Sequence, residues 1–122
     1  MLDLLYSDLT DKIIKCFYTV YNELGYGFLE KVYENSLMIE LEEASLSAEN
    51  QIEIKTFYHN KIVGVYFADV IVENKIILEL KAHESLRNED YAQLLNYLKA
   101  SDIKVGLLMN FGKKPEFKRV VF

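Results

Sequence analysis

Three charged residues lie in stretches of the sequence that are otherwise too apolar to accept them. Asp69 lies within Val65–Val72, and Glu79 and Lys81 lie within Lys75–Lys81. An isolated buried carboxylate costs several kcal/mol, so such a group normally has a partner or binds a metal ion. Taken alone, Glu79 and Lys81 are also consistent with an ion pair at a half-exposed strand end. These three residues are the first candidates for chemistry.

The two stretches are predicted to be neighbouring antiparallel strands joined by a turn at Glu73-Asn74. This turn would pair residue 72 with about residue 75, so that Asp69 and Glu79 lie opposite or diagonal. Their Cβ atoms would then be ~4.5–5.5 Å or ~7–8 Å apart. Two like charges that close repel each other unless a divalent cation lies between them. Mg²⁺ prefers carboxylate oxygens and keeps waters that a phosphate substrate can replace. With Lys81 placed to orient a water or offset negative charge, the pattern predicts a metal-dependent phosphodiesterase.

Periodicity predicts the elements that must position these residues. Apolar residues three and four apart indicate a helix that ends before Gly25 and a second one, marked by Leu29, Val32, Tyr33, Leu37 and Leu41, that ends near residues 45–47. Alternation then predicts strands over residues 51–58, 61–72 and 75–81, the first two joined by a His59-Asn60 turn. A helix with Asn88 as its N-cap, a buried strand over residues 104–110 parallel to the third strand, and an edge strand over 117–122 complete the chain. We therefore expect one α/β domain over residues 1–122, with a mixed central sheet flanked by helices.

Five short motifs in a fixed order resemble one known family. Asp69 followed by Glu79-Leu80-Lys81 is similar to the catalytic signature of the PD-(D/E)XK nuclease superfamily, with Ala68 in place of the usual proline. The remaining motifs are G-x-x-E-x-x-Y over residues 27–33, Q-x-x-x-Y over 93–97 as in RecB-like members, Val105-Gly106-Leu107-Leu108 and Asn110-Phe111-Gly112. Together they resemble the bacterial GxxExxY proteins, from about residue 8 to the end. Phe67 departs from this pattern, because the family often carries arginine there.

The resemblance implies a restriction-endonuclease-like αβββαβ core and a role for each matching residue. Asp69 and Glu79 would ligate Mg²⁺ or Mn²⁺ with the backbone carbonyl of Leu80, and Lys81 would assist the nucleophilic water. Glu30 would act as a further ligand or orient the base. The remaining matching residues would support the site or contact the nucleic acid backbone, and they are Tyr33, Gln93 and Tyr97.

Simpler interpretations remain open for several of these residues. Glu30 is also consistent with a solvent-facing helical glutamate, and Tyr33 with a core residue on the apolar face of its helix. Gln93 and Tyr97 are also consistent with a purely structural hydrogen-bonding pair. At the level of function, the alternative to a nuclease that cuts DNA in preference to RNA is a catalytically silent nuclease-fold module for binding or assembly. Because a 122-residue domain leaves little room for a separate DNA-reading domain, we expect a homodimer or a protein partner in either case.

Charge and composition exclude some classes of protein. The net charge is −5, from 14 Lys and Arg against 19 Asp and Glu, which argues against a protein that coats nucleic acid non-specifically. Residues 99–122 nevertheless carry six cations and two anions, which indicates either a solvated tail or a surface that steers phosphates. The single Cys16 is typical of a cytoplasmic protein, and no apolar run approaches the ~20 residues that span a membrane.

Overall fold

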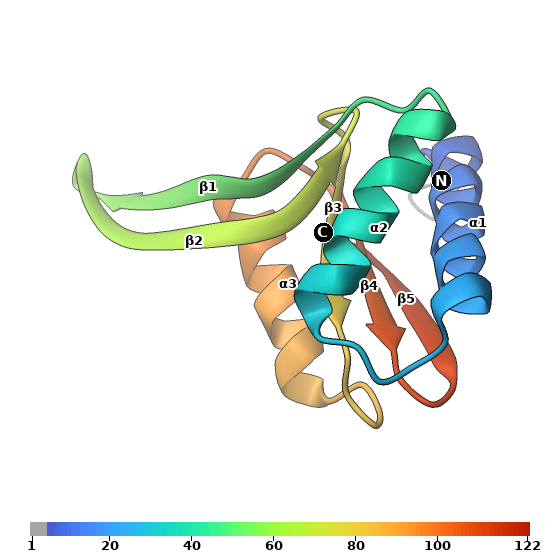
Figure 1. Ribbon diagram of the computed structural model, residues 1–122. Helices are drawn as coiled ribbons and strands as arrows, with labels where there is room; N and C mark the ends of the chain where they lie inside the picture. Colours follow the sequence, from blue (N-terminus) through green and yellow to red (C-terminus); the bar gives the residue numbers. More distant parts are fainter. Residues whose placement is uncertain (1–4) are drawn as a thin grey trace.

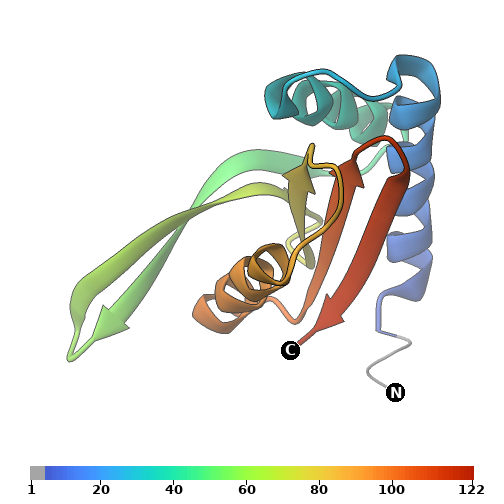
Figure 2. The ribbon, with the colours of Figure 1, turned by 90° about the horizontal axis from the view of Figure 1, so that it is seen from below.

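A mixed five-stranded sheet runs through the computed structural model, which describes residues 5–122, and helices cover both of its faces (Figure 1; Figure 2). The helices are α1 (Ser7–Leu24), α2 (Glu30–Glu43) and α3 (Asn88–Ala100). The strands are β1 (Ala48–Tyr58), β2 (Lys61–Val72), β3 (Ile76–Lys81), β4 (Val105–Phe111) and β5 (Pro115–Val121), and they lie side by side in that order. This arrangement confirms the predicted α/β class with a mixed sheet.

Only the β3–β4 pair is parallel, as the strand–helix–strand pattern predicts. Lys81 pairs with Asn110 at its end, while β1–β2, β2–β3 and β4–β5 are antiparallel. The crossover helix α3 covers one face of the sheet, and α1 and α2 cover the other (Figure 2). Because both faces are covered, β4 is buried over its whole length.

Alternation along β3 divides its side chains between two hydrophobic cores. Ile76, Leu78 and Leu80 pack with α1 and α2. Ile77 packs with Leu94, Leu98 and other residues on the α3 side. Glu79 and Lys81 share the face of Ile77 by the same alternation, so they lie on the α3 side of the sheet.

Several predicted boundaries need correction. Asn88 is the first residue of α3 and not its N-cap. The cap position is Arg87, whose backbone N–H donates to Asp90 Oδ2 at 3.0 Å. In α2, the predicted apolar stripe is only partly buried, since Leu29 precedes the helix with 81% of its surface exposed. Strand β1 starts at Ala48, before the predicted residue 51, because it pairs with the full length of β2.

The two hairpins differ in how far their strands stay together. His59 and Asn60 have positive φ angles of 50° and 63°, as the two-residue turn between β1 and β2 requires. Val72 pairs with Ile76 and not with residue 75, so three residues connect β2 to β3. Only three residue pairs join β2 to β3, and they lie at the C-terminal end of β2. The earlier part of β2 extends away from β3 with β1 as a long arm (Figure 1). No helix within residues 5–122 is both long and apolar enough to cross a membrane.

Candidate active site

Asp69 and Glu79 lie where β2 separates from β3. The last paired residues are Val70 and Leu78. Beyond them, hydrogen bonds between the two carboxylates and backbone N–H groups replace the backbone pairing. Asp69 Oδ2 accepts from the backbone N–H of Leu80 at 2.8 Å, and Glu79 Oε1 accepts from the backbone N–H of Asp69 at 3.2 Å. The structure thus brings the two predicted carboxylates together, each bonded to the backbone of the opposite strand.

The electrostatics of this pair are unfavourable for two negative charges. Glu79 is only 2% exposed. Burial, followed by the charge of Asp69, raises the pKa of Glu79 to about 8. Burial also raises the pKa of Asp69, and the charges of Glu34 and Glu30 act in the same direction. No ion pair with a lysine or arginine involves either carboxylate in residues 5–122. The charge of Lys81 acts to lower the pKa of both groups, but burial and the neighbouring carboxylates outweigh it.

Lys81 is held beside this pair by residues of α3. Its Nζ donates to Gln93 Oε1 at 2.8 Å and lies 4.0 Å from Asp90 Oδ1. Gln93 Nε2 in turn donates to the Tyr97 hydroxyl at 2.9 Å. Burial and the charge of Glu79 raise the pKa of Tyr97, so its hydroxyl stays protonated. Gln93 and Tyr97 thus form a chain of hydrogen bonds that fixes the position of Lys81.

The two predicted residues of α2 have different surroundings. Glu30 is the first residue of the helix and is exposed. The negative charge of Glu30 acts to raise the pKa of both Asp69 and Glu79, although Glu30 does not form a compact group with them. Tyr33 is fully buried, and its hydroxyl donates to the carbonyl of Gly25 at 2.6 Å and accepts from the N–H of Phe28 at 3.2 Å. Tyr33 is therefore a core residue that also holds the loop before α2.

Another buried carboxylate, Glu34, lies near the site and was not among the predicted residues. Its side chain accepts hydrogen bonds from Lys31, Asn50 and Gln51. Burial pushes the pKa of Glu34 upward, but these hydrogen bonds outweigh it and the pKa is lowered. Gln51 has a positive φ of 52° between Asn50 and Ile52, which pair with Val70 and Ala68. The strained residue thus lies across from Asp69, and its side-chain amide donates to Glu34. Only the i, i+4 spacing of Glu34 from Glu30 could have indicated it.

The donor set fits a divalent cation of the Mg²⁺ class. Two adjacent carboxylates, one buried and one half-buried, suit an ion that usually takes one or two carboxylates and completes its shell with water and phosphate oxygens. Within residues 5–122 there is no group of three or more Asp, Glu, His or Cys side chains that could hold a metal. A cation at Asp69 and Glu79 would thus need the backbone carbonyl of Leu80, water or substrate to complete its coordination.

The basic C-terminal segment does not form one surface. Lys113 and Lys114 lie in the turn between β4 and β5, at the same end of the sheet as Lys81. Lys104 precedes β4 and lies beside Phe122, at the opposite end of that seven-residue strand. The length of β4 therefore separates Lys104 from Lys113 and Lys114 by about 20 Å. The turn pair thus lies at the end of the sheet that holds Lys81, whereas Lys118 of β5 lies over the ring of Tyr91 in α3.

Comparisons with known proteins agree with this fold. A family model described as the PD-(D/E)XK nuclease superfamily matches residues 7–120. Among solved structures, the chain is similar to one titled "Crystal structure of SSO0001", with a TM-score of 0.60 and 20% sequence identity. The match covers 98% of this chain and 61% of that chain. At this identity the likeness shows the fold alone, and it agrees with the restriction-endonuclease-like core. A search of curated proteins gave no match.

Proposed function

Because the chain belongs to the PD-(D/E)XK nuclease superfamily, we propose that it is a cytoplasmic nuclease that hydrolyses phosphodiester bonds in DNA with Mg²⁺ or Mn²⁺. The observation that carries this proposal is the half-buried Asp69 beside the buried Glu79. Neither carboxylate is in an ion pair within residues 5–122, and the charge of Lys81 acts on both. DNA is preferred over RNA by the resemblance to RecB-like enzymes, and the G-x-x-E-x-x-Y motif supports assignment to the GxxExxY proteins.

Asp69 and Glu79 would hold the cation, with the backbone carbonyl of Leu80 as a third protein ligand. When bound, the cation would lower the pKa of a water and offset charge on the phosphate. Lys81 would place a positive charge beside the reacting phosphate, and Gln93 would keep its Nζ from swinging into solvent. Tyr97 would set the orientation of the Gln93 amide. Glu30 would orient the base or serve as a further ligand, and Tyr33 would support the site through the loop that precedes Glu30.

Removal of the metal tests this function directly. Plasmid and single-stranded DNA should be cut in the presence of Mg²⁺ or Mn²⁺, and EDTA should slow the cleavage by at least about 100-fold. Excess Mn²⁺ added after EDTA should restore the rate. The measurement is the initial rate on end-labelled DNA, with RNA of the same sequence as a comparison. If the protein binds Mn²⁺ but cuts no substrate with any metal, the silent binding module is the correct interpretation.

We also propose that two copies of this chain pair through β1. This strand lies at the edge of the sheet and forms one side of the protruding arm (Figure 1). The arm exposes an unusual number of large apolar side chains, which are Phe57, Tyr58, Ile62, Val63, Val65 and Phe67. Glu53 and Lys55 form an ion pair at 3.3 Å on β1. In an antiparallel pair of β1 strands centred on Ile54, each Glu53 would face Lys55 of the other copy, so the edge is complementary to itself.

A charge exchange tests this pairing. Lys55→Glu should weaken dimerisation at least about tenfold, because it would place like charges opposite each other across the two-fold axis. The double variant Glu53→Lys/Lys55→Glu should dimerise again, since the complementarity is restored with the signs reversed. Light scattering coupled to size-exclusion chromatography, over a series of concentrations, measures the mass. A monomer at all concentrations, or variants that dimerise like the wild type, would contradict the proposal.

A further inference from the structure

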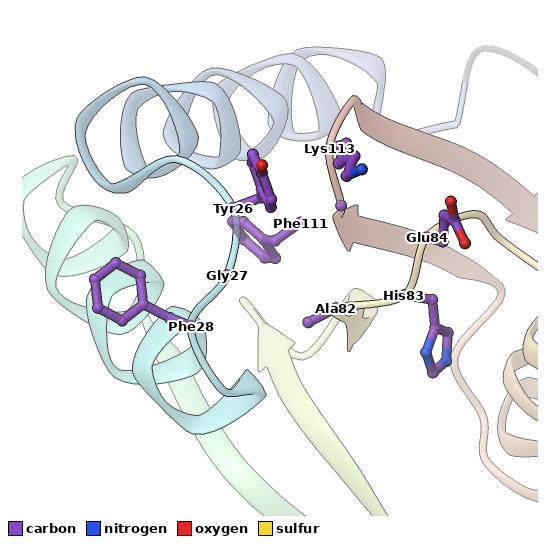
Figure 3. A pocket seen from close by; sticks show the side chains of 9 residues that line it. Tyr26, Gly27, Phe28, Ala82, His83, Glu84, Phe111 and Lys113 are labelled. Carbon is purple, nitrogen blue, oxygen red and sulfur yellow. The ribbon is translucent and has the colours of Figure 1, made fainter.

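A hollow of about 350 Å³ opens next to the candidate active site and has no role in the chemistry described above. Three segments surround it (Figure 3): residues 26–28 from the loop between α1 and α2, residues 82–84 after β3, and residues 111–113 at the β4–β5 turn. We call it the loop pocket. Its volume lies within the range of small-molecule binding sites in proteins.

Each wall of the loop pocket is fixed by a side chain from the body of the protein. The Tyr33 hydroxyl ties the first segment, through Gly25 and Phe28. The fully buried Asn110 ties the second, since its Oδ1 accepts from the N–H of His83 at 2.8 Å and its Nδ2 donates to the His83 carbonyl at 3.0 Å.

The third wall, residues 111–113, is also held by hydrogen bonds and close packing. The Tyr21 hydroxyl lies 2.7 Å from the carbonyl oxygens of both Gly112 and Lys113. Gly112 packs so closely against the second segment that a Cβ there would come within 2.3 Å of the His83 carbonyl oxygen. The three loops therefore form a pre-organised pocket, which reduces the entropic cost of ordering the loops when a ligand binds.

The loop pocket lies close to the site of Lys81. Ala82, which lines the pocket, is the next residue in the chain. His83 Nε2 lies 3.5 Å from Asp90 Oδ1, the same oxygen that lies 4.0 Å from Lys81 Nζ. A strand of nucleic acid with one phosphate at Lys81 would thus bring a neighbouring nucleotide to the pocket.

The lining suits an aromatic base that carries a phosphate. Tyr26 is 58% exposed, and Phe28 is 47% exposed with its ring 6.1 Å from that of Tyr33. No ring contact engages Tyr26 in the described residues, so its face is available for stacking. Lys113 contributes a cation to the lining, and Glu84 contributes an anion. Stacking on an aromatic ring tolerates any base, and it requires a base that is not already stacked within a duplex.

We propose that the loop pocket holds the base of an unpaired nucleotide next to the phosphodiester that is cut, so that the substrate is a single strand, a frayed end or a branch point rather than continuous duplex. Tyr26 stacks on this base, and Lys113 contacts its phosphate. This assignment of substrate class rests on the proposed nuclease function.

The test measures binding and cleavage separately. Fluorescence anisotropy in EDTA compares a labelled single-stranded oligonucleotide with the blunt duplex of the same sequence. The wild type should bind the single strand more tightly, and Tyr26→Ala and Lys113→Gln should each weaken that binding about tenfold without weakening duplex binding. Phe122→Ala and Lys12→Gln are matched controls that replace an exposed aromatic and an exposed lysine elsewhere, and they should bind within about twofold of the wild type.

The outcomes separate the pocket from the nuclease function. If the wild type cuts DNA with Mg²⁺ while the Tyr26 and Lys113 variants bind and cut single strands normally, the pocket assignment is wrong and the nuclease function stands. If the variants lose single-strand binding but the wild type cuts nothing with any metal, the pocket stands and the nuclease function is wrong. Preference for continuous duplex, or no binding to either oligonucleotide, would overturn the pocket assignment.

Discussion

Asp69→Asn is expected to lower metal-dependent DNA cleavage by roughly 10³-fold or more while the protein keeps its fold. The amide oxygen of asparagine can still accept the hydrogen bond from the N–H of Leu80, so the strand ends stay joined. The negative charge that would attract the cation is lost, and with it several kcal/mol of transition-state stabilisation. Initial cleavage rates and circular dichroism measure the two effects. Asp102→Asn, at an exposed aspartate after α3, is the matched control and should cut DNA at the wild-type rate.

A second substitution separates metal binding from chemistry. Lys81→Met keeps the aliphatic chain but removes the charge that Gln93 holds in place. Cleavage should fall roughly 10²- to 10⁴-fold, while Mn²⁺ affinity measured by calorimetry stays within a few-fold of the wild type. Asp69→Asn should lose both DNA cleavage and Mn²⁺ affinity. Cleavage that survives both substitutions would come from a contaminating nuclease, and the catalytic assignment would then be wrong.

Glu79→Gln is expected to stabilise the metal-free protein at pH 8. The pKa of Glu79 is about 8 in the folded protein against an ordinary value of 4.5, so the folded state holds a proton that the unfolded state has released. The free energy of unfolding should therefore fall as the pH rises from about 4.5 to about 8, by at most about 5 kcal/mol at 1.36 kcal/mol per pKa unit. The groups that act on Glu79 are Asp69, Glu30 and Lys81, together with burial. Glutamine carries no charge and can still accept from the N–H of Asp69.

Thermal unfolding in EDTA over this pH range measures the effect, with Glu89→Gln, an exposed residue of α3, as the control. The wild type should lose stability with rising pH, and Glu79→Gln should lose much less. Adding Mn²⁺ at pH 8 should then stabilise the wild type by mass action but not the glutamine variant. A glutamine variant that is less stable than the wild type at pH 8, or that responds equally to Mn²⁺, would show that the proposed ligand set is wrong.

The relation between Asp69 and Glu79 was predictable because it depends only on strand periodicity and a short connection. An error of one residue in the turn, where Val72 pairs with Ile76, still left the two carboxylates adjacent. Sequence also indicated that β3 and β4 are parallel, since a helix joins them. These features follow from local patterns along the chain.

Other features depend on packing between distant elements, which no local pattern encodes. Glu34 of α2 is held because Asn50 and Gln51 of β1 donate hydrogen bonds to its carboxylate. Gln51 adopts a positive φ although its residue type does not favour one. Asp90 lies in the first turn of α3, and no local pattern indicates that it would contact Lys81 and His83. Lys104, Lys113 and Lys114 are close in sequence, but the length of β4 separates the first from the other two.

Where β2 separates from β3, side-chain hydrogen bonds replace the backbone bonds between the strands. This replacement has a consequence for the evolution of this family. Asp69 and Glu79 tie the two strands together through the N–H groups of Leu80 and Asp69. A descendant that had lost its activity would still be under selection to keep side chains that can accept these bonds. The presence of the two carboxylates in a homologue is therefore weak proof of catalysis. Lys81 bonds to a side chain of α3 and not to the strand ends, so its loss is the mutation that would mark an inactive lineage.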